Sequence, residues 1–173
     1  MVKILYFILI SLALAILQVS LIPNWSIGGG VVNLPLIAIT FWIFTGWHAK
    51  RTESEQLIPA LILGITIDLL SSAQFLSSTI SYFLVTSLLL LLRRLVSFEN
   101  HLIIMIPIVF TQVVAYDIFF IFLNKIYVFN TRIIQTILLD GVLTALIFAL
   151  IIVFQRYFKK KFFHHSDIKL IER

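Results

Sequence analysis

The chain has 173 residues, of which 61% are hydrophobic and only 12% are charged. Because a soluble globular domain carries about 25% charged residues, this composition excludes an ordinary soluble domain and predicts a membrane protein with several spans. The net charge of +5 does not indicate nucleic-acid binding, since the basic residues lie at the edges of apolar segments, and the lack of cysteine excludes disulfides and thiolate sites.

Six apolar segments follow one another along the chain and predict an all-α bundle of six transmembrane helices. Their approximate bounds are 4–22, 31–47, 57–72, 75–92, 102–123 and 133–157. A spanning helix needs about 20 residues, so the third segment is short unless residues 71–74 extend its last turn. The first segment continues past Gln18 and is interpreted as an uncleaved helix. We expect one transmembrane domain, residues 1–158, and a basic tail, residues 159–173.

The loop after the first segment contains three consecutive glycines, Gly28 to Gly30, and the second segment begins shortly after it. The glycines lack the Lys-Ser/Thr pattern of a phosphate-binding loop, so we interpret them as a flexible turn. Asn33 is placed to cap the second helix. Pro35 suits its first turn, where the missing N–H has no helical partner.

The third segment places a carboxylate, Asp68, in a stretch suited to lipid. Nine of the fourteen residues from 57 to 70 are Leu or Ile. They favour insertion by about 3–5 kcal/mol, whereas one central Asp costs about 2.5–3.5 kcal/mol. Asp68 is therefore either part of a functional site or a helix-end residue that faces a polar loop.

Two further acids lie inside predicted spans, Asp117 in the fifth and Asp140 in the sixth. From a helical rise of about 1.5 Å per residue, all three acids are expected at or above the middle of the bilayer, in its outer half. The predicted spans contain no Lys or Arg near them to neutralise their charge. We therefore expect an outward-facing polar recess, or a docked partner helix.

Small and polar residues accompany two of these acids on their own helix faces, because positions four apart stack on one side of a helix. Gly64, Asp68 and Ser71 form one such set, and Asp140 and Thr144 belong to another together with Thr136. Small residues at this spacing allow close helix packing in lipid. The sets therefore indicate either a partner or recess site, or ordinary internal packing.

Basic residues predict the orientation of the bundle. With a cytoplasmic start, all 13 except Lys125 and Arg132 fall on the inner side, so both termini are expected in the cytoplasm. The basic tail could bind anionic lipids of the inner leaflet, or it could serve only as a stop-transfer anchor. The lipid-surface candidates are Arg156, Lys159, Lys160 and Lys161.

The sequence gives little indication of catalysis. All four histidines lie in predicted cytoplasmic loops or the tail, and no HExxH or GxSxG motif is present. We therefore expect a protein that is not an enzyme and that has no cofactor or metal.

Two short motifs resemble the MreD family of the bacterial rod-shape, or cell-elongation, system. They are Asn33-Leu34-Pro35-Leu36 and the stretch from Gly64 to Ser72, Gly-Ile-Thr-Ile-Asp-Leu-Leu-Ser-Ser. Length, six-span layout and basic C-terminus are also similar to that family. In the family a Pro and a Gly typically follow the acidic motif, and here Gln74 and Leu76 stand roughly in their places.

The resemblance implies a multi-pass scaffold in the bacterial cytoplasmic membrane that helps to regulate cell shape and peptidoglycan synthesis. Its expected partner is an MreC-like protein with one membrane span, and through it the elongation glycosyltransferase, the transpeptidase and MreB. The implied fold is similar to the substrate-binding subunits of energy-coupling-factor transporters. A vitamin-binding transporter subunit is therefore the alternative function.

Overall fold

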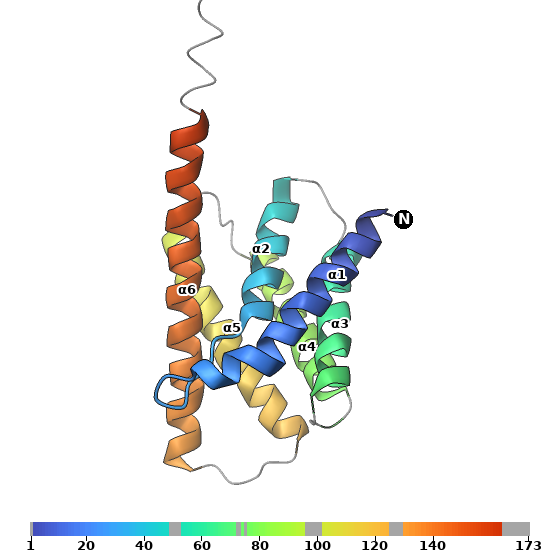
Figure 1. Cartoon of the computed structure of the whole chain (residues 1–173), viewed down its shortest axis with the longest axis vertical. Helices are drawn as coiled ribbons and strands as arrows, with labels where there is room; N and C mark the ends of the chain where they lie inside the picture. Colours follow the sequence, from blue (N-terminus) through green and yellow to red (C-terminus); the bar gives the residue numbers. More distant parts are fainter. Residues whose placement is uncertain are drawn as a thin grey trace, which may run out of the picture.

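The computed structural model describes residues 2–48, 53–71, 74, 76–95, 102–124 and 130–163 (Figure 1). Over these residues the chain forms helices joined by short loops, and no β-strand is present. The α-helices are α1 (Val2–Ile16), α2 (Leu34–His48), α3 (Glu53–Leu70), α4 (Ser77–Leu95), α5 (Leu102–Leu123) and α6 (Thr131–Phe163). The predicted all-α class is thus confirmed for the described residues.

Two of these helices are long and apolar enough to cross a membrane, which supports a membrane protein. They are the stretches Met105–Leu123 in α5 and Thr131–Gln155 in α6. Among the described residues, shorter apolar helices cover Leu9–Asn24, Leu34–Ile43 and Ser77–Leu92. In Figure 1 α1, α3 and α5 run towards the lower end of the molecule, and α2 and α6 run back.

The first helix does not continue regularly to residue 22. After α1 the chain forms a π-helical turn, η1 (Leu17–Leu21), and then a 3₁₀ turn, η2 (Ile22–Trp25). Pro23 contributes to the change, because proline has no N–H to donate to a carbonyl one turn back and its ring crowds that turn. The N–H of Ile22 therefore bonds to the carbonyl of Leu17, five residues back.

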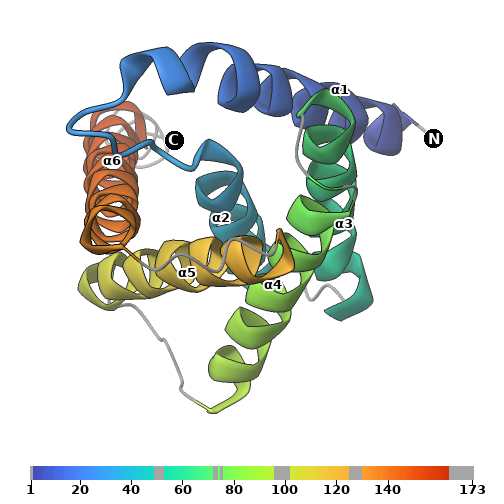
Figure 2. The same cartoon turned by 90° about the horizontal axis from the view of Figure 1, so that it is seen from below.

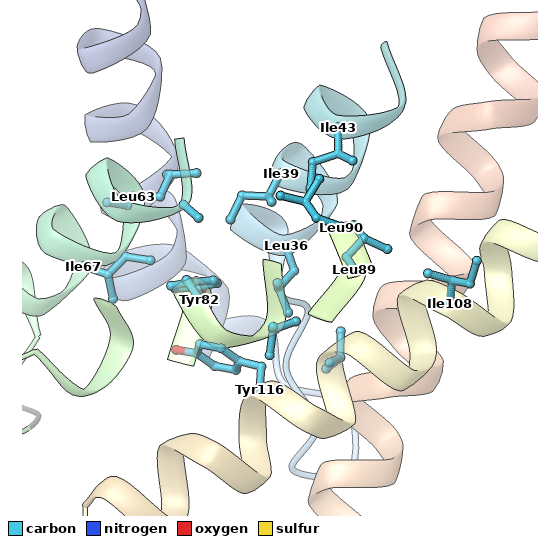
Figure 3. Close-up of a cluster of buried hydrophobic side chains, with 14 residues drawn as sticks. Leu36, Ile39, Ile43, Leu63, Ile67, Tyr82, Leu89, Leu90, Ile108 and Tyr116 are labelled. Carbon is cyan, nitrogen blue, oxygen red and sulfur yellow. The ribbon is translucent and has the colours of Figure 1, made fainter. Parts of the chain in front are cut away.

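Helix α2 lies at the centre of the bundle. Viewed from the lower end, it is surrounded by α1, α3, α5 and α6 (Figure 2). Leu36, Ile39 and Ile43 of α2 are at most 1% exposed and pack in one core cluster with side chains of α3, α4 and α5 (Figure 3). Ile37, on another side of α2, packs with α5 and α6. Burial on both sides explains why this helix is apolar all round.

Several predicted boundaries differ from the structure, and three helices extend clearly beyond the predicted apolar segments. Helix α3 begins at Glu53, four residues before the apolar segment, and contains Pro59 in its second turn. Helix α4 runs to Leu95 rather than 92, and α6 continues to Phe163 rather than 157. Hydropathy marks where apolar residues end, whereas polar helix-forming residues extend the helices beyond that point.

The residue before α4 adopts a left-handed backbone conformation. Leu76 has a φ of 69°, and it is the only non-glycine residue with positive φ in the described part of the chain. The left-handed conformation costs an L-residue other than glycine roughly 1–2 kcal/mol. The residue before α4 is thus a leucine in a backbone conformation that glycine favours.

Replacing Leu76 by glycine is expected to stabilise the protein by about 1 kcal/mol, because glycine adopts this φ without a steric cost. The measurement is the free energy of unfolding in detergent, from titration with sodium dodecyl sulfate followed by circular dichroism. The matched control is Leu88→Gly, an exposed position inside α4. There the same change should destabilise by about 1 kcal/mol. Equal destabilisation by both substitutions would contradict the prediction.

Candidate functional site

Asp68 lies at the last turn of α3 and accepts hydrogen bonds from the first turn of α4. Its Oδ1 accepts from the N–H of Ser78 at 2.9 Å, and its Oδ2 accepts from the N–H and the hydroxyl of Thr79 at 2.9 and 2.6 Å. A helix start normally receives these bonds from its own capping residue, which Leu76 cannot provide. Asp68 therefore caps α4 from the neighbouring helix, which agrees with its helix-end interpretation.

Gly64 and Ser71, predicted to share a site with Asp68, also belong to the contact between α3 and α4. A Cβ atom on Gly64 would lie 2.4 Å from the Cα of Thr79, so only glycine permits this approach. Ser71 is half-buried beyond the end of α3, and its N–H bonds to the carbonyl of Ile67. The set is thus internal packing in this structure.

The three glycines form a defined tight turn. Gly28 and Gly29 both have positive φ, as a two-residue type I′ turn requires. Ile27 and Gly30 close the turn with two backbone hydrogen bonds of 3.0 Å. A Cβ on Gly30 would lie 2.6 Å from the Cβ of Leu139, so the loop rests directly on α6. The predicted turn is confirmed, but geometry rather than flexibility requires the glycines.

Helix α6 holds the rest of this loop along one face. The N–H of Val31 donates to Asp140 Oδ1, and the N–H of Asn33 donates to Thr144 Oγ1 at 3.0 Å. Two residues of extended chain cover about 6.8 Å and four residues of α-helix about 6 Å. That match allows the loop to meet α6 at every second residue. The predicted set of Asp140 and Thr144 therefore positions the loop.

The start of α2 is fixed by three polar contacts. Asn33 Oδ1 accepts from the N–H of Leu36 at 3.1 Å, which confirms the predicted cap. Pro35 lies in the first turn, as expected. Two contacts were not predicted: Gln18 Oε1 accepts from the N–H of Leu34, and the hydroxyl of Tyr82 donates to Asn33 Oδ1. The π-helical turn of η1 carries Gln18.

Asp117 and Asp140 line a polar recess between α5, α6 and this loop. Its inner chamber has a volume of about 110 Å³. The inner chamber is lined by Gln18, Val31, Asn33, Ile67, Tyr82, Val113, Tyr116, Asp117 and Asp140. Its outer chamber, of about 320 Å³, lies between α5 and α6. The outer chamber is lined by Tyr116, Asp117, Phe120, Ile121, Ile133, Thr136, Ile137 and Asp140. We call the two chambers together the acidic recess.

Of the three acids predicted to share a recess, the structure brings together Asp117 and Asp140 but not Asp68. Tyr116, Asp117 and Asp140 border both chambers of the acidic recess. Asp68 lines neither chamber, because its two oxygens face the start of α4. The expectation of a recess is therefore correct for two acids, and Asp68 has a different role.

Aromatic rings form one wall of the acidic recess. The rings of Tyr82 and Tyr116 lie 4.4 Å apart, and those of Tyr116 and Phe120 are stacked at 5.9 Å. Figure 3 shows Tyr82 and Tyr116 side by side in the core. Sequence reasoning missed both tyrosines. A phenol in the middle of an apolar helix was the available signal, because a buried hydroxyl needs a hydrogen-bond partner.

The acidic recess has two carboxyl groups and no basic group in its described lining. No Lys or Arg is among the described residues that line its two chambers. Asp140 uses Oδ1 to hold Val31, whereas Asp117 Oδ2 is buried and has no hydrogen-bond partner among the described residues. Over the same residues, no group of three His, Cys, Asp or Glu side chains forms a metal site. The arrangement is suited to a positively charged or hydrogen-bond-donating group.

The predicted lipid-surface residues are described only in their backbone. Arg156, Lys159, Lys160 and Lys161 belong to α6, but their side chains lie outside the described residues. Their expected contact with anionic lipids therefore stays a prediction.

No protein-family model, curated protein or solved structure matches this chain.

Proposed function

We propose that the protein is a non-enzymatic scaffold in the bacterial cytoplasmic membrane, of the MreD kind, that binds a single-span MreC-like partner. Through that partner it would act with the elongation glycosyltransferase, the transpeptidase and MreB to regulate cell shape and peptidoglycan synthesis. The observation that carries the proposal is the acidic recess, which places two carboxylates in an apolar helical bundle without a counter-charge among its described lining residues. Ionisable groups at such positions are expensive and usually functional.

The motifs that carry the resemblance also support this proposal, because both contribute to the packing of the bundle. Asn33 caps the central helix, and the stretch with Gly64 and Asp68 joins α3 to α4. Leu76 departs from the family pattern, in which a glycine typically follows the acidic motif, although its backbone conformation is one that glycine favours. These residues determine how the bundle folds, so they would be shared by proteins of one architecture.

In the proposed topology all six helices span the bilayer and both termini are cytoplasmic. Support comes from the exposed large apolar side chains on the outer surfaces of the helices, such as Leu146, Leu150 and Val153 of α6. Exposed apolar surface of this extent marks a membrane or protein contact. The loop of residues 26–33 and the start of α6 would then lie on the outer side, where the acidic recess opens towards an extracytoplasmic partner.

A small-molecule-binding transporter subunit is the second candidate. The outer chamber of the recess, about 320 Å³, reaches the lower end of the range of ligand pockets, about 300–1,000 Å³. Its wall combines aromatic rings with a few polar groups, as ligand sites do. The inner chamber, by contrast, is too small for a vitamin-sized molecule.

Affinity purification of the tagged protein from its own cells, in mild detergent, tests the proposal. We expect a stoichiometric partner with one membrane span and a large extracytoplasmic region. The same preparation, denatured and extracted, is analysed for small molecules by mass spectrometry. A bound vitamin with no such partner would support the transporter subunit instead. The control is an unrelated multi-span protein with the same tag, which should retain neither the single-span partner nor a vitamin.

A further inference from the structure

The acidic recess contains two carboxyl groups, and no Lys or Arg among its described lining residues pairs with either of them. Asp117 and Asp140 come from two different helices and face one hollow. One oxygen of Asp117 is buried without a hydrogen-bond partner among the described residues, and Asp140 holds the loop by accepting from the N–H of Val31. Buried carboxylates without a compensating charge are costly, and the cost is greatest in an apolar environment. A ligand that supplies positive charge would therefore bind here with a large gain.

The walls of the recess favour an organic cation over other ligands. Tyr116 and Phe120 present stacked aromatic rings beside the carboxylates, and such rings attract ammonium and guanidinium groups. An anion would meet two acidic side chains and no positively charged group among the described lining residues. An apolar ligand would leave Asp117 Oδ2 without a partner. A divalent metal ion requires about six oxygen ligands, whereas the described chain offers two carboxylates with no third acid, His or Cys beside them.

The shape of the recess fits a long basic side chain. Its outer chamber lies between α5 and α6, and its inner chamber of about 110 Å³ has room for about three or four water molecules at about 30 Å³ each. A Lys or Arg side chain can bury its apolar stem along Ile133 and Ile137 while its charged end reaches the carboxylates. A helix packed against α5 and α6 would present such a side chain directly.

We propose that the acidic recess binds a Lys or Arg side chain of the partner's membrane segment, held between Asp117 and Asp140 and against the rings of Tyr116 and Phe120. This inference rests on the proposed scaffold function and names the chemical group that the scaffold recognises. The partner is thus expected to carry a basic residue near the outer end of its span.

Removing the two charges without changing shape tests the ionic contact. In the double variant Asp117→Asn, Asp140→Asn, the residue at 140 keeps an oxygen for the N–H of Val31, so the fold should be retained. Partner capture in the affinity purification is expected to fall at least tenfold, because the loss of one side of a buried charge pair strongly weakens binding. The matched control, Glu55→Gln, makes the same chemical change at an exposed position outside the recess and should capture normally.

A cation built into the recess tests the site without any partner. Thr136 lines the outer chamber and lies one helical turn before Asp140, so the ammonium group of Thr136→Lys can reach the carboxylates. We expect this variant to melt about 2–4 °C higher than Thr136→Met in the same detergent. The difference should vanish when Asp117→Asn and Asp140→Asn are added. Thr136→Lys should also reduce partner capture, because the introduced group occupies the site.

The outcomes separate this inference from the proposed function. If the wild type captures a single-span partner and the double Asn variant captures it equally well, the scaffold function stands and the ionic contact is wrong. If no partner is captured, the scaffold function fails and the melting comparison alone decides about the cation. Equal melting of the Lys and Met variants would refute the inference. Stabilisation of the wild type by calcium chloride but not by n-butylammonium chloride would assign the recess to a metal ion instead.

Discussion

Asp68→Leu is expected to lower the free energy of unfolding by roughly 2–6 kcal/mol. The substitution leaves two buried N–H groups, those of Ser78 and Thr79, without an acceptor, and each costs about 1–3 kcal/mol. It also removes a negative charge from the start of α4, where the helix dipole favours one. Since whole proteins are stable by only about 5–15 kcal/mol, this is among the largest effects available to a single substitution.

The same substitution should have the opposite effect on membrane insertion. If α3 spans the membrane in the proposed topology, leucine removes the insertion cost of an acid, which is at most about 2.5–3.5 kcal/mol at the centre of a span. We therefore expect Asp68→Leu to reach the membrane fraction in normal or higher amount, yet to unfold at a lower concentration of denaturing detergent. Immunoblots of membrane fractions measure the first quantity, and titration with sodium dodecyl sulfate measures the second.

Two related variants remove only part of the contact between Asp68 and α4 and should therefore have smaller effects on the free energy of unfolding. Asp68→Asn keeps an acceptor for one N–H only and should fall between wild type and leucine. Thr79→Val removes only the hydroxyl contact at 2.6 Å and should be milder than Asp68→Leu. An unfolding free energy for Asp68→Leu within about 0.5 kcal/mol of wild type, the usual range for harmless surface changes, would show that Asp68 does not cap α4.

Gly64→Ala is expected to destabilise the protein by about 2 kcal/mol or more. The added methyl group would lie 2.4 Å from the Cα of Thr79 and 3.0 Å from its nitrogen, so α4 must move away. Overpacking of this kind costs typically about 1–3 kcal/mol. The movement also lengthens the bonds between Asp68 and the first turn of α4, which adds to the loss. The better helix propensity of alanine offsets only about 1 kcal/mol of this loss in the free energy of unfolding.

Gly141→Ala is the matched control for this prediction. There the added Cβ would meet ring carbons of Phe110 at 2.8 Å, a side chain that can turn aside, rather than backbone. Unfolding in detergent should show a change within about 1 kcal/mol, since propensity and crowding oppose each other. In the Asp68→Leu background the effect of Gly64→Ala should shrink, because neighbouring substitutions that break the same contact are not additive. Equal effects at positions 64 and 141 would contradict the close approach of α3 and α4.

The sequence predicted the six helices and their order because apolar residues mark helices of this kind clearly. It also predicted the cap at Asn33 and a recess containing Asp117 and Asp140, since these follow from local rules and from estimated depth in the bilayer. It could not distinguish the two roles of Asp68. That choice depends on how closely the start of α4 approaches α3, which is a property of packing rather than of spacing.

Other features were missed because their causes lie far apart in the chain. The position of Gln18 follows from the π-helical turn before Pro23, and its partner is the start of another helix. The glycines of residues 28–30 were interpreted locally, whereas their packing partner, Leu139, lies more than a hundred residues later. Patterns within one segment carry no information about such contacts.

The contact of the first loop with α6 has a consequence for biosynthesis. Asp140 and Thr144 belong to α6, the last of the described helices. The hydrogen bonds that hold the loop through Val31 and Asn33 therefore cannot form until most of the chain has been made. Until then Gln18 and Asn33 are present, but the wall that completes the hollow is missing. A nascent or C-terminally truncated chain that lacks α6 therefore cannot offer the finished pocket, and the proposed partner could be recognised only after α6 has been made.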